Sequence, residues 1–448
     1  MKHKTLWTAT ALAASLTAVP ALAQDFDWRA HEGAEITWAY AIHPYADALA
    51  GQLGEFGALT GIKVTPELYP DDTYWSKLNI QLSTGSADWD VVGTGVQPAW
   101  DMTPAGQLAP LKAMLTDPAR TNPDYDYEDM FPALRSAWTW TVEGDEIVPG
   151  EDGEVWGIPH AFENIQLMYR TDIFERLGLT VPATLPELIE TCVKIREADP
   201  DLTPMAVRGV RFWSSIHTAP VSIATTYGVK DYVETDGALD TGLDSPQSVA
   251  FHKDYVEMIQ TCAGDSWAND NWYQVVDGLS TGKAAMAVDA NMFGFWNDVE
   301  GASDAAGKIA FAPPPTAPDA ASSASNIWIW SLAINNASDD KDAAWYFIQW
   351  ATSKEMALRG ATEGKLVNPP RQSTWASPEW LDYAGQATFN NFVDVFKDVQ
   401  ANTALQFTPR YGFGTAINAW AVALQDMVGG DDVEERLTEL ADEIREEL

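Results

Sequence analysis

The chain has 448 residues, a formal net charge of −38 and 46% hydrophobic residues. Because so acidic a surface repels nucleic acid and anionic lipid, we expect neither as a partner, and a solvated acidic face accounts for the charge. The length and the apolar content favour two domains, each with a sizeable core.

The first 23 residues are typical of a secretory signal. Lys2 and Lys4 precede an apolar run that ends at Val19, and Ala21-Leu22-Ala23 stands before Gln24. This pattern predicts a signal peptide over 1–23 that is cleaved after Ala23, and hence export to the periplasm. No later segment approaches the roughly 20 apolar residues of a membrane-spanning helix, so we expect a soluble exported protein.

Strands and helices alternate through the region after this signal. Residues 35–40, 62–68 and 89–95 read as strands, because they are short, apolar or alternating, and rich in β-branched and aromatic residues. Residues 45–61 and 72–85 carry helical apolar spacing, the second through Trp75, Leu78 and Leu82. Alternation of this kind predicts a parallel sheet that is covered by helices.

The alternation resumes with a strand at 165–170, two helices, and a strand at 284–292. A segment rich in proline, "FAPPPTAPDAASSAS", then interrupts it, and we interpret this segment as a connector between lobes because Pro313-Pro314-Pro315 cannot continue a helix or a central strand. A strand at 327–334, a helix at 341–352 and a docked surface helix at 431–448 complete the pattern.

The two cysteines, Cys192 and Cys262, fall on the apolar faces of the two middle helices. Thr184 and Glu187 form a capping box before the first helix, and Ser245 caps the second. In an oxidising compartment a disulfide between these helices is favoured over two buried thiols. Neither cysteine has a partner at metal-ligand spacing, so we expect no metal site or cofactor there.

The stretch "VWGIPHAFENIQLMYRTD" places Glu163 and Asn164 within an apolar, strand-like run. A carboxylate in such a run has no evident structural role. It therefore predicts that the strand passes a polar binding site.

Ordered blocks along the chain resemble the extracellular solute-binding proteins of ABC importers, family 1, the sugar-binding group that includes the maltose-binding protein. The blocks are "EFGALTGIKV", "LSTGSADWDVV", "AGQLAPL", "GIPHAFENIQLMYRTDIFERLGLTVPATLPEL", "LSTGKAAMAVDANMF", "WSLAINNASDDKDAAWYFIQWATS" and "VNPPRQS". Each block alone is a weak signal, but their order and spacing together are specific and cover nearly the whole exported chain.

The resemblance implies an α/β architecture, the two-lobe periplasmic binding protein fold of type II, with hinge strands between the lobes. By position, crossings would fall near Pro159–Phe162, Ala312–Pro315 and Gly360–Lys365. The first lobe would comprise 24–160 and 313–360, and the second 161–312 and 361–448.

The implied function is capture of a sugar or polyol between the lobes and its delivery to a membrane permease. We expect a monomer that is not an enzyme and needs no cofactor. A sugar requires paired donors and acceptors for its hydroxyls and aromatic rings for its apolar faces. Residues of these types fall where strand-to-helix loops should line a cleft: His43, Tyr45, Gln97, Trp100, Asn326 and Trp328 in the first lobe, and Glu163, Asn164, Arg211, Trp213, Asp289, Asn291, Arg371, Arg410 and Tyr411 in the second.

By position, Glu163 matches a carboxylate that contacts sugar in the maltose-binding protein, and Tyr411 lies near a stacking tryptophan there. The loop "GTGVQPAW" lacks the Asp-Arg pair that holds maltose, and Met292 or Phe293 stands where another tryptophan stacks. These departures argue against a maltodextrin and leave a monosaccharide, a polyol or a different disaccharide.

Structural roles compete with binding roles for several of these residues. Trp38, Trp75, Trp345 and Trp350 lie on periodic apolar faces and read as core. Trp100, Trp213 and Trp328 fit either role, and Arg371 and Arg410 fit surface ion pairs equally well.

Other functions remain open from the residues alone. A secreted glycoside hydrolase would need two carboxyls roughly 5 to 9 Å apart across the scissile bond, and 65 acids leave room for such a pair. Iron binders of the same fold use clustered tyrosines, and polyamine binders use several acids between aromatic walls. An acidic run from Asp124 lacks the glycine and the final acid of a calcium loop, and the histidines show no zinc spacing.

Overall fold

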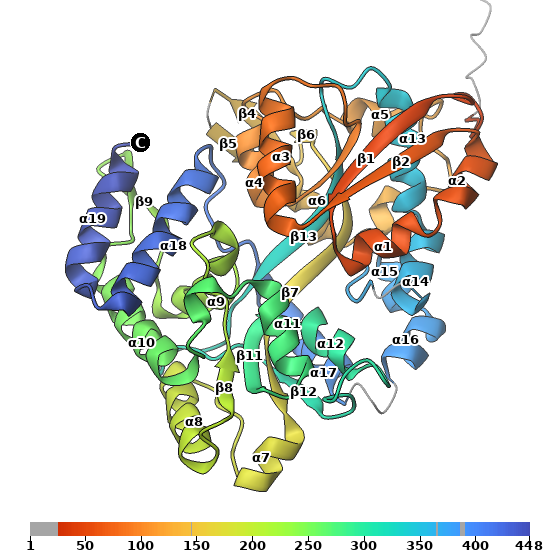
Figure 1. The fold of residues 1–448 in the computed structure, drawn as a ribbon. Coiled ribbons are helices and arrows are strands. Elements are labelled where there is room, and N and C mark those ends of the chain that lie inside the picture. Colours follow the sequence, from red (N-terminus) through yellow and green to blue (C-terminus); the bar gives the residue numbers. More distant parts are fainter. Residues whose placement is uncertain (1–25, 145, 364–365, 386–389) are drawn as a thin grey trace, which may run out of the picture.

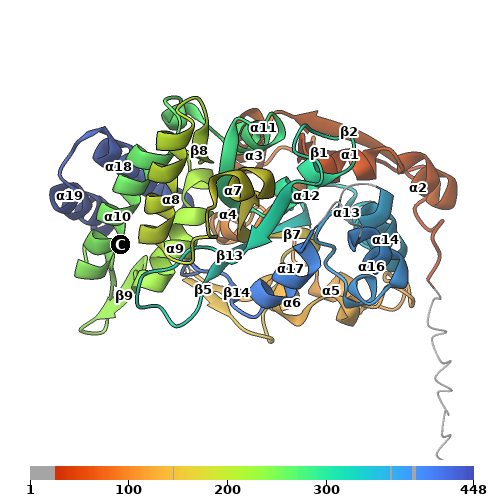
Figure 2. The same cartoon turned by 90° about the horizontal axis from the view of Figure 1, so that it is seen from below.

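The computed structural model describes residues 26–448 apart from 145, 364–365 and 386–389, so the predicted signal peptide lies outside the described residues. Two α/β lobes are joined by long strands that run diagonally between them (Figure 1). The predicted fold class is therefore confirmed. Viewed from below, the joining strands occupy the middle of an elongated molecule (Figure 2).

The first lobe is built from the N-terminal third of the chain and two later helices. It contains β1 (Glu35–Ala41), α1 (Pro44–Ala50), α2 (Leu53–Thr60), β2 (Lys63–Tyr69), α3 (Asp71–Ser83), β3 (Val91–Thr94), α4 (Val96–Met102), α5 (Lys112–Thr116), η1 (Tyr127–Asp129), α6 (Pro132–Ala137), β4 (Thr139–Glu143), β5 (Glu146–Pro149), β6 (Glu154–Val155), α13 (Lys341–Ala351) and α14 (Lys354–Glu363). Two short helices, α15 (Gln372–Trp375) and α16 (Pro378–Ala384), pack against α14.

The second lobe holds the middle of the chain and its C-terminal helices. It contains α7 (Thr171–Leu177), α8 (Leu185–Ala198), β8 (Thr203–Ala206), η2 (Trp213–Ser215), α9 (Ala219–Tyr227), β9 (Tyr232–Thr235), β10 (Ala238–Thr241), α10 (Pro246–Cys262), η3 (Trp267–Asn269), α11 (Trp272–Ser280), β11 (Ala284–Ala290), α12 (Met292–Asp298), β12 (Ile309–Ala312), α17 (Phe392–Gln400), β14 (Thr403–Ala404), α18 (Phe413–Gly429) and α19 (Val433–Arg445).

Strands β7 (Ile158–Arg170) and β13 (Ser325–Ile334) belong to both lobes. They make one continuous mixed sheet in the order β2-β1-β3-β13-β7-β11-β8. β7 pairs with β13 as far as Asn164 and with β11 from Ile165 onward. The chain thus passes between lobes beside Glu163, and this stretch is the joining strand that the sequence predicted.

The predicted elements are confirmed with small adjustments. The alternation over residues 35–95 is present, but the single helix expected over 45–61 is two helices, because α1 ends at Ala50, with Gly51 as its C-cap, and α2 starts at Leu53. Cys192 of α8 is buried, as its place on the apolar face of a helix predicted; its neighbour Leu188 is buried too, whereas Val193 is exposed.

The proline-rich connector lies on the second lobe rather than between the lobes. Thr316 N–H donates to the Ala183 carbonyl, and Ala317 N–H donates to the Thr226 hydroxyl. The chain returns to the first lobe within β13, which pairs with β14 at Ser325 and with β3 from Ser331. The return therefore comes about ten residues later than the predicted crossing at Ala312–Pro315, because backbone pairing rather than the proline run decides it. Part of the third predicted crossing, 364–365, lies outside the described residues.

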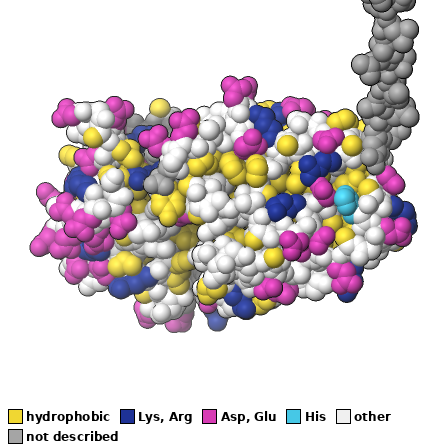
Figure 3. All heavy atoms as spheres, turned by 90° about the horizontal axis from the view of Figure 1, so that it is seen from above, with side chains coloured by type: hydrophobic (Ala, Val, Ile, Leu, Met, Phe, Trp, Pro, Cys, Tyr) yellow, Lys and Arg dark blue, Asp and Glu magenta, His cyan; other side chains and the backbone are white. Residues whose placement is uncertain are grey.

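The C-terminal segment forms a surface helix, as predicted. Leu437, Leu440 and Ile444 of α19 are buried against the lobe. Acidic side chains gather at this end of the molecule (Figure 3). None of the helices in the described ranges is long and apolar enough to cross a membrane.

A disulfide joins Cys192 of α8 to Cys262 of α10, with their Cα atoms 5.2 Å apart. Both side chains are fully buried, and the two helices pack along each other. The bridge closes a loop across a sequence separation of 70 residues. It should therefore restrict the unfolded chain substantially.

Replacing both cysteines by alanine should lower the free energy of unfolding by about 4 kcal/mol, since a loop of this length loses about that much closure entropy in the denatured state. Urea unfolding of the oxidised wild type, the reduced wild type and the double variant measures the change. The reduced wild type should resemble the variant, and equal stability of all three proteins would contradict a structural bridge.

Candidate functional site

Two cavities lie where the lobes meet. The larger is an open groove of about 1260 Å³ between α3, α4 and β5 of the first lobe and α18 of the second. Hydrophobic side chains border the hollow beside the acidic end of the molecule (Figure 3). The smaller is a narrow chamber between aromatic side chains of both lobes. It is lined by His43, Asp71, Trp75, Glu163, Arg208, Trp213, Ser214, His217, Trp272, Met292, Phe293, Trp328 and Trp330.

Glu163 stands at the point where β7 changes its pairing partner. Its side chain is buried, and its Oε1 accepts a hydrogen bond from Trp330 Nε1 at 2.7 Å. Burial raises the pKa of this carboxyl to about 8, even though Arg208 and the Trp330 bond lower it. At neutral pH the group is therefore mostly a neutral carboxylic acid, which can both donate and accept a hydrogen bond.

Arg208 and Asp289 form a buried ion pair beside this acid. Arg208 Nη2 and Nε donate to the two oxygens of Asp289 at 2.6 and 2.8 Å. Arg208 Nη1 lies 3.2 Å from the Ser214 carbonyl and 3.3 Å from His217 Nε2. The guanidinium is thus held in one orientation at the chamber wall, as bidentate geometry favours.

The histidines of the site are neutral. Burial lowers the pKa of His43 to about 3, and burial together with the nearby Arg208 charge holds the pKa of His217 well below its ordinary value. His217 Nδ1 and Trp328 Nε1 are buried and have no hydrogen-bond partner among the described residues. Because unpaired buried polar atoms are costly, these two atoms favour a polar occupant of the chamber.

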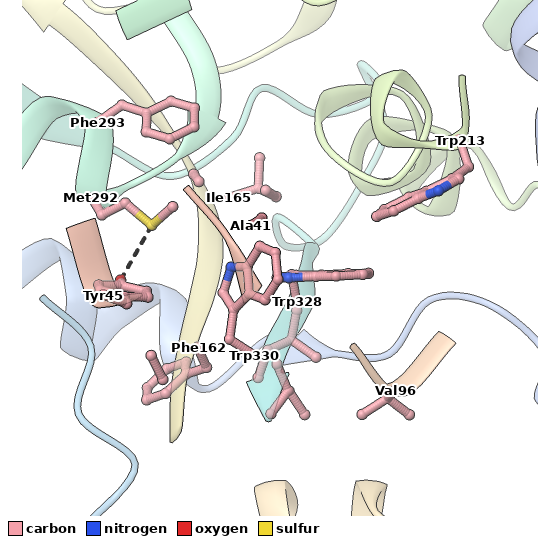
Figure 4. Packing of buried hydrophobic residues seen from close by; sticks show 14 of the residues in the cluster. Ala41, Tyr45, Val96, Phe162, Ile165, Trp213, Met292, Phe293, Trp328 and Trp330 are labelled. Carbon is pink, nitrogen blue, oxygen red and sulfur yellow. Dashed lines mark hydrogen bonds between the residues drawn. The ribbon is translucent and has the colours of Figure 1, made fainter. Parts of the chain in front are cut away.

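Aromatic rings close the chamber on several sides. Trp213 stacks on Trp328 with ring centroids 4.8 Å apart, and Trp328 meets Trp330 edge to face (Figure 4). On another side Trp272 stacks on Phe293 at 6.0 Å. Such rings supply flat apolar walls for C–H groups.

The fold brings these residues together because they follow the carboxyl ends of strands. His43 caps α1 just after β1, and Asp71 opens α3 just after β2. Arg208 follows β8, while Met292 and Phe293 begin α12 after β11. In α/β sheets this edge is where ligands bind.

The structure places four predicted residues in the chamber wall: His43, Glu163, Trp213 and Trp328. Two more lie directly behind the wall. Asp289 holds Arg208, and the Tyr45 hydroxyl donates to Met292 Sδ at 3.3 Å (Figure 4). Arg410 and Tyr411 line the groove instead.

Four predicted amides and rings lie outside both cavities. Gln97 donates to the Ile327 carbonyl, and Trp100 packs against Phe413. Asn291 exchanges amide bonds with Asn368, and Asn326 donates to the His217 carbonyl. These contacts lie at the junction between the lobes.

Three further predicted residues also lie outside both cavities. Asn164 accepts a bond from Gln166 within β7. Arg211 is exposed and pairs with Asp426. Arg371, which we placed in the second lobe, is fully buried in the first, where it donates to the carbonyls of Thr352, Asp126 and Tyr125.

Residues that sequence analysis did not assign to the site complete the wall: Asp71, Trp75, Arg208, Ser214, His217, Trp272, Met292, Phe293 and Trp330. Trp75, expected in the core, borders the chamber. The alternation of Trp328 and Trp330 along β13 could have identified Trp330, because residues two apart on a strand share a face. Arg208 lies closer to the end of β8 than Arg211 does. This position after a strand could have identified Arg208 as the arginine of the site.

Taken together, the chamber offers the neutral acid Glu163, a second acid Asp71 that accepts a hydrogen bond from Trp75, one compensated ion pair, neutral imidazoles and apolar walls. Within the described part of the chain, no group of three or more His, Cys, Asp or Glu side chains is placed to hold a metal ion. This chemistry suits a small, neutral molecule that carries several hydroxyl groups.

Comparison with known proteins relates most of the chain to binding proteins for small solutes. A sequence model described as bacterial extracellular solute-binding protein matches residues 39–358. An erythritol/L-threitol-binding protein from Mycolicibacterium smegmatis is 33% identical over 417 residues, which cover 93% of this chain and 86% of that protein. A mannitol-binding protein from Pseudomonas aeruginosa is 25% identical over 310 residues, 67% of this chain and 65% of that protein.

Solved structures share the fold at lower identity. A solute-binding protein of an ABC transporter from Agrobacterium radiobacter K84, in complex with ribitol, aligns with a TM-score of 0.80 and 20% identity over 93% of this chain and 99% of that chain. A second solute-binding protein of an ABC transporter, from Agrobacterium vitis S4 with bound D-mannitol, aligns with a TM-score of 0.78 and 21% identity. This alignment covers 92% of this chain and 98% of that chain. Both support the two-lobe architecture.

Replacing Glu163 by Gln should remove a pH dependence of stability. The folded carboxyl keeps its proton up to its pKa of about 8, whereas in the unfolded chain it ionises near 4.5. Between these values the folded state binds more protons, so this group lowers the stability of the wild type as pH rises, by up to about 1.4 kcal/mol per pH unit.

Urea unfolding of ligand-free protein at several pH values from about 5 to 8 tests this expectation. The stability of Glu163→Gln relative to wild type should increase steadily with pH across that range. The exposed Glu190→Gln serves as the control and should show a constant difference. A constant difference for Glu163→Gln as well would contradict the raised pKa.

Proposed function

This chain belongs to the bacterial extracellular solute-binding protein family, and we propose that it captures a short acyclic polyol in the chamber and delivers it to the permease of an ABC importer. The observation that carries the proposal is the enclosure of Glu163 and the Arg208–Asp289 pair by tryptophans of both lobes. A short polyol presents alternating hydroxyl and C–H groups, and the chamber matches both.

The polarity of the chamber favours a neutral polyol over a polyamine. A polyamine would bring several positive charges beside buried Arg208, whose own charge Asp289 already balances, and would find Asp71 as the one further acid beside the mostly neutral Glu163. The resemblance to an erythritol/L-threitol-binding protein at 33% identity supports a four-carbon ligand.

Capture would couple the ligand to closure of the lobes. His43, Asp71, Trp75 and Trp330 come from the first lobe or its joining strand, and Arg208, Ser214, Trp213 and Trp272 come from the second. Only a closed arrangement brings both sets to one ligand. A polyol that contacts both sets therefore shifts the open–closed equilibrium toward closure.

The proposal includes the cellular setting. Residues 1–23 would direct export and be removed after Ala23, and the remaining monomer would act in the periplasm. We propose that it binds its solute without hydrolysing it and without a cofactor. The strong negative charge repels nucleic acid, so we propose no nucleic-acid partner.

Calorimetric titration of the exported chain, unfolded and refolded to remove bound solute, should show binding of erythritol or L-threitol. We expect a dissociation constant of about one micromolar or lower, which corresponds to a binding free energy of about −8 kcal/mol or more negative. Maltose, spermidine and ferric citrate, by contrast, should give no heat. Chromatography should recover the polyol intact; a cleaved sugar product would make the protein a hydrolase, and absence of any polyol binding would contradict the proposal.

Replacing Glu163 by Ala should weaken polyol binding at least about tenfold, because a hydroxyl would lose a partner inside a dry site and Trp330 Nε1 would lose its acceptor. Glu190→Ala, at an exposed position on α8, should bind as the wild type does. Unchanged affinity of Glu163→Ala in a folded protein would remove this residue from the site.

Asp101 should stabilise the closed arrangement of the two lobes through hydrogen bonds between them. Its carboxylate, on α4 of the first lobe, accepts backbone N–H bonds from Gly412, Phe413 and Gly414 at the start of α18 at 2.6, 3.1 and 2.9 Å. Asp101→Ala should weaken polyol affinity by about tenfold, because the closed form loses charge-assisted bonds. Titration calorimetry and small-angle scattering measure affinity and the open fraction. Exposed Asp88→Ala is the control, and closure as complete as in wild type would contradict this role of Asp101.

A further inference from the structure

Trp75 and Trp213 form the partition between the chamber and the groove. Among the described residues they alone line both cavities. Their ring centroids lie 5.3 Å apart, nearly perpendicular at 84°. Both rings are buried, so the partition is closed in this structure.

Each ring of the partition is fixed by its neighbours. Trp75 stacks on Trp330 at 6.0 Å, and its Nε1 donates to Asp71 at 3.0 Å. Trp213 stacks on Trp328 at 4.8 Å (Figure 4). These contacts leave neither indole free to turn aside without loss of stacking.

Trp213 is also anchored through its backbone. Its N–H donates to Asn418 Oδ1 of α18 at 2.7 Å. Trp75 belongs to α3 of the first lobe and Trp213 to η2 of the second. The partition is therefore assembled from one residue of each lobe when the lobes meet.

The groove beyond the partition carries the side-chain types that bind hydroxyl groups. Glu146, Asn79 and Arg410 line it, together with the half-exposed ring of Tyr411. The Arg410 guanidinium packs over the ring of Tyr232 at 4.5 Å. A hydroxylated chain that extended past the partition would find both polar partners and apolar surface.

We propose that the contact between Trp75 and Trp213 determines the maximum length of the ligand. It separates the polyol site from the groove, so the additional carbons of a six-carbon polyol that extended in this direction would have to occupy the space of the indoles. Removal of either indole would join the chamber to the groove and admit the longer chain. The inference rests on the proposed function, since it concerns the same polyol site.

The test compares erythritol and D-mannitol by titration calorimetry on the refolded wild type and two partition variants, Trp213→Ala and Trp75→Ala. The wild type should prefer erythritol by about 100-fold, and each variant should bind D-mannitol at least about tenfold more tightly than the wild type does. Trp213→Leu, which retains an apolar side chain, provides a milder variant if the alanine variants do not fold.

Val148→Ala is the matched control. Val148, on β5, is exposed and lines the groove but not the chamber, so its truncation widens the groove and leaves the partition in place. This variant should keep the erythritol affinity and the selectivity of the wild type. A gain of D-mannitol binding in Val148→Ala equal to that in Trp213→Ala would overturn the inference.

The remaining outcomes separate this inference from the proposed function. Erythritol binding by the wild type without any gain of D-mannitol binding in the folded partition variants overturns the length limit and leaves polyol capture intact. Equal affinity of the wild type for erythritol and D-mannitol also overturns the length limit and leaves polyol capture intact. Binding of neither polyol by the wild type overturns both.

Discussion

A buried guanidinium–carboxylate pair imposes the main constraint on this molecule. Arg208 and Asp289 are almost inaccessible to solvent, and the pair costs free energy unless its hydrogen-bonding capacity is filled. The Ser214 carbonyl and His217 fill part of it, and both lie within the same turn of chain that carries Trp213. The charge pair therefore fixes the segment that forms one wall of the chamber.

The aromatic walls and the low charge of the chamber follow from the same constraint. Water is nearly excluded, so a second full charge beside Arg208 and Asp289 would be poorly solvated, and Glu163 responds by holding its proton. Beside the acid Asp71, the wall offers a neutral acid, neutral imidazoles and an indole N–H that has no partner among the described residues, so most of its hydrogen-bonding groups are neutral. Such a surface discriminates by the number and position of hydroxyl groups rather than by charge.

The lobes are linked to this chemistry because neither lobe has a complete site. β7 and β13 carry Glu163, Trp328 and Trp330 along the line where the lobes join, and each lobe adds its own groups from either side. Asp101 joins the lobes at a second point, at the start of α18. Ligand contacts and direct contacts between lobes therefore stabilise the same closed arrangement.

Sequence patterns predicted the architecture and part of the site. Alternating periodicities fix the elements of each lobe, and a carboxylate within an apolar strand identified Glu163. The position of the return crossing was not predictable in the same way, since strand pairing between distant segments decides it. Trp75 shows a related limit, because its helical spacing is that of a core residue, and only the approach of the second lobe makes it a wall of the chamber.

Arg211 and Arg371 show a further limit of the sequence patterns. Both are chemically suitable for a sugar site, yet their donors are taken by Asp426 and by three backbone carbonyls. Which of several arginines faces a ligand depends on the strand end that each follows and on partners far away in the sequence.

The most direct test of the account is a crystal structure of the exported chain grown with erythritol. The account predicts electron density for one polyol between Glu163, Arg208 and Trp330, with the lobes closed around it. Density for the polyol in the groove at Tyr411, with an empty chamber, would contradict it.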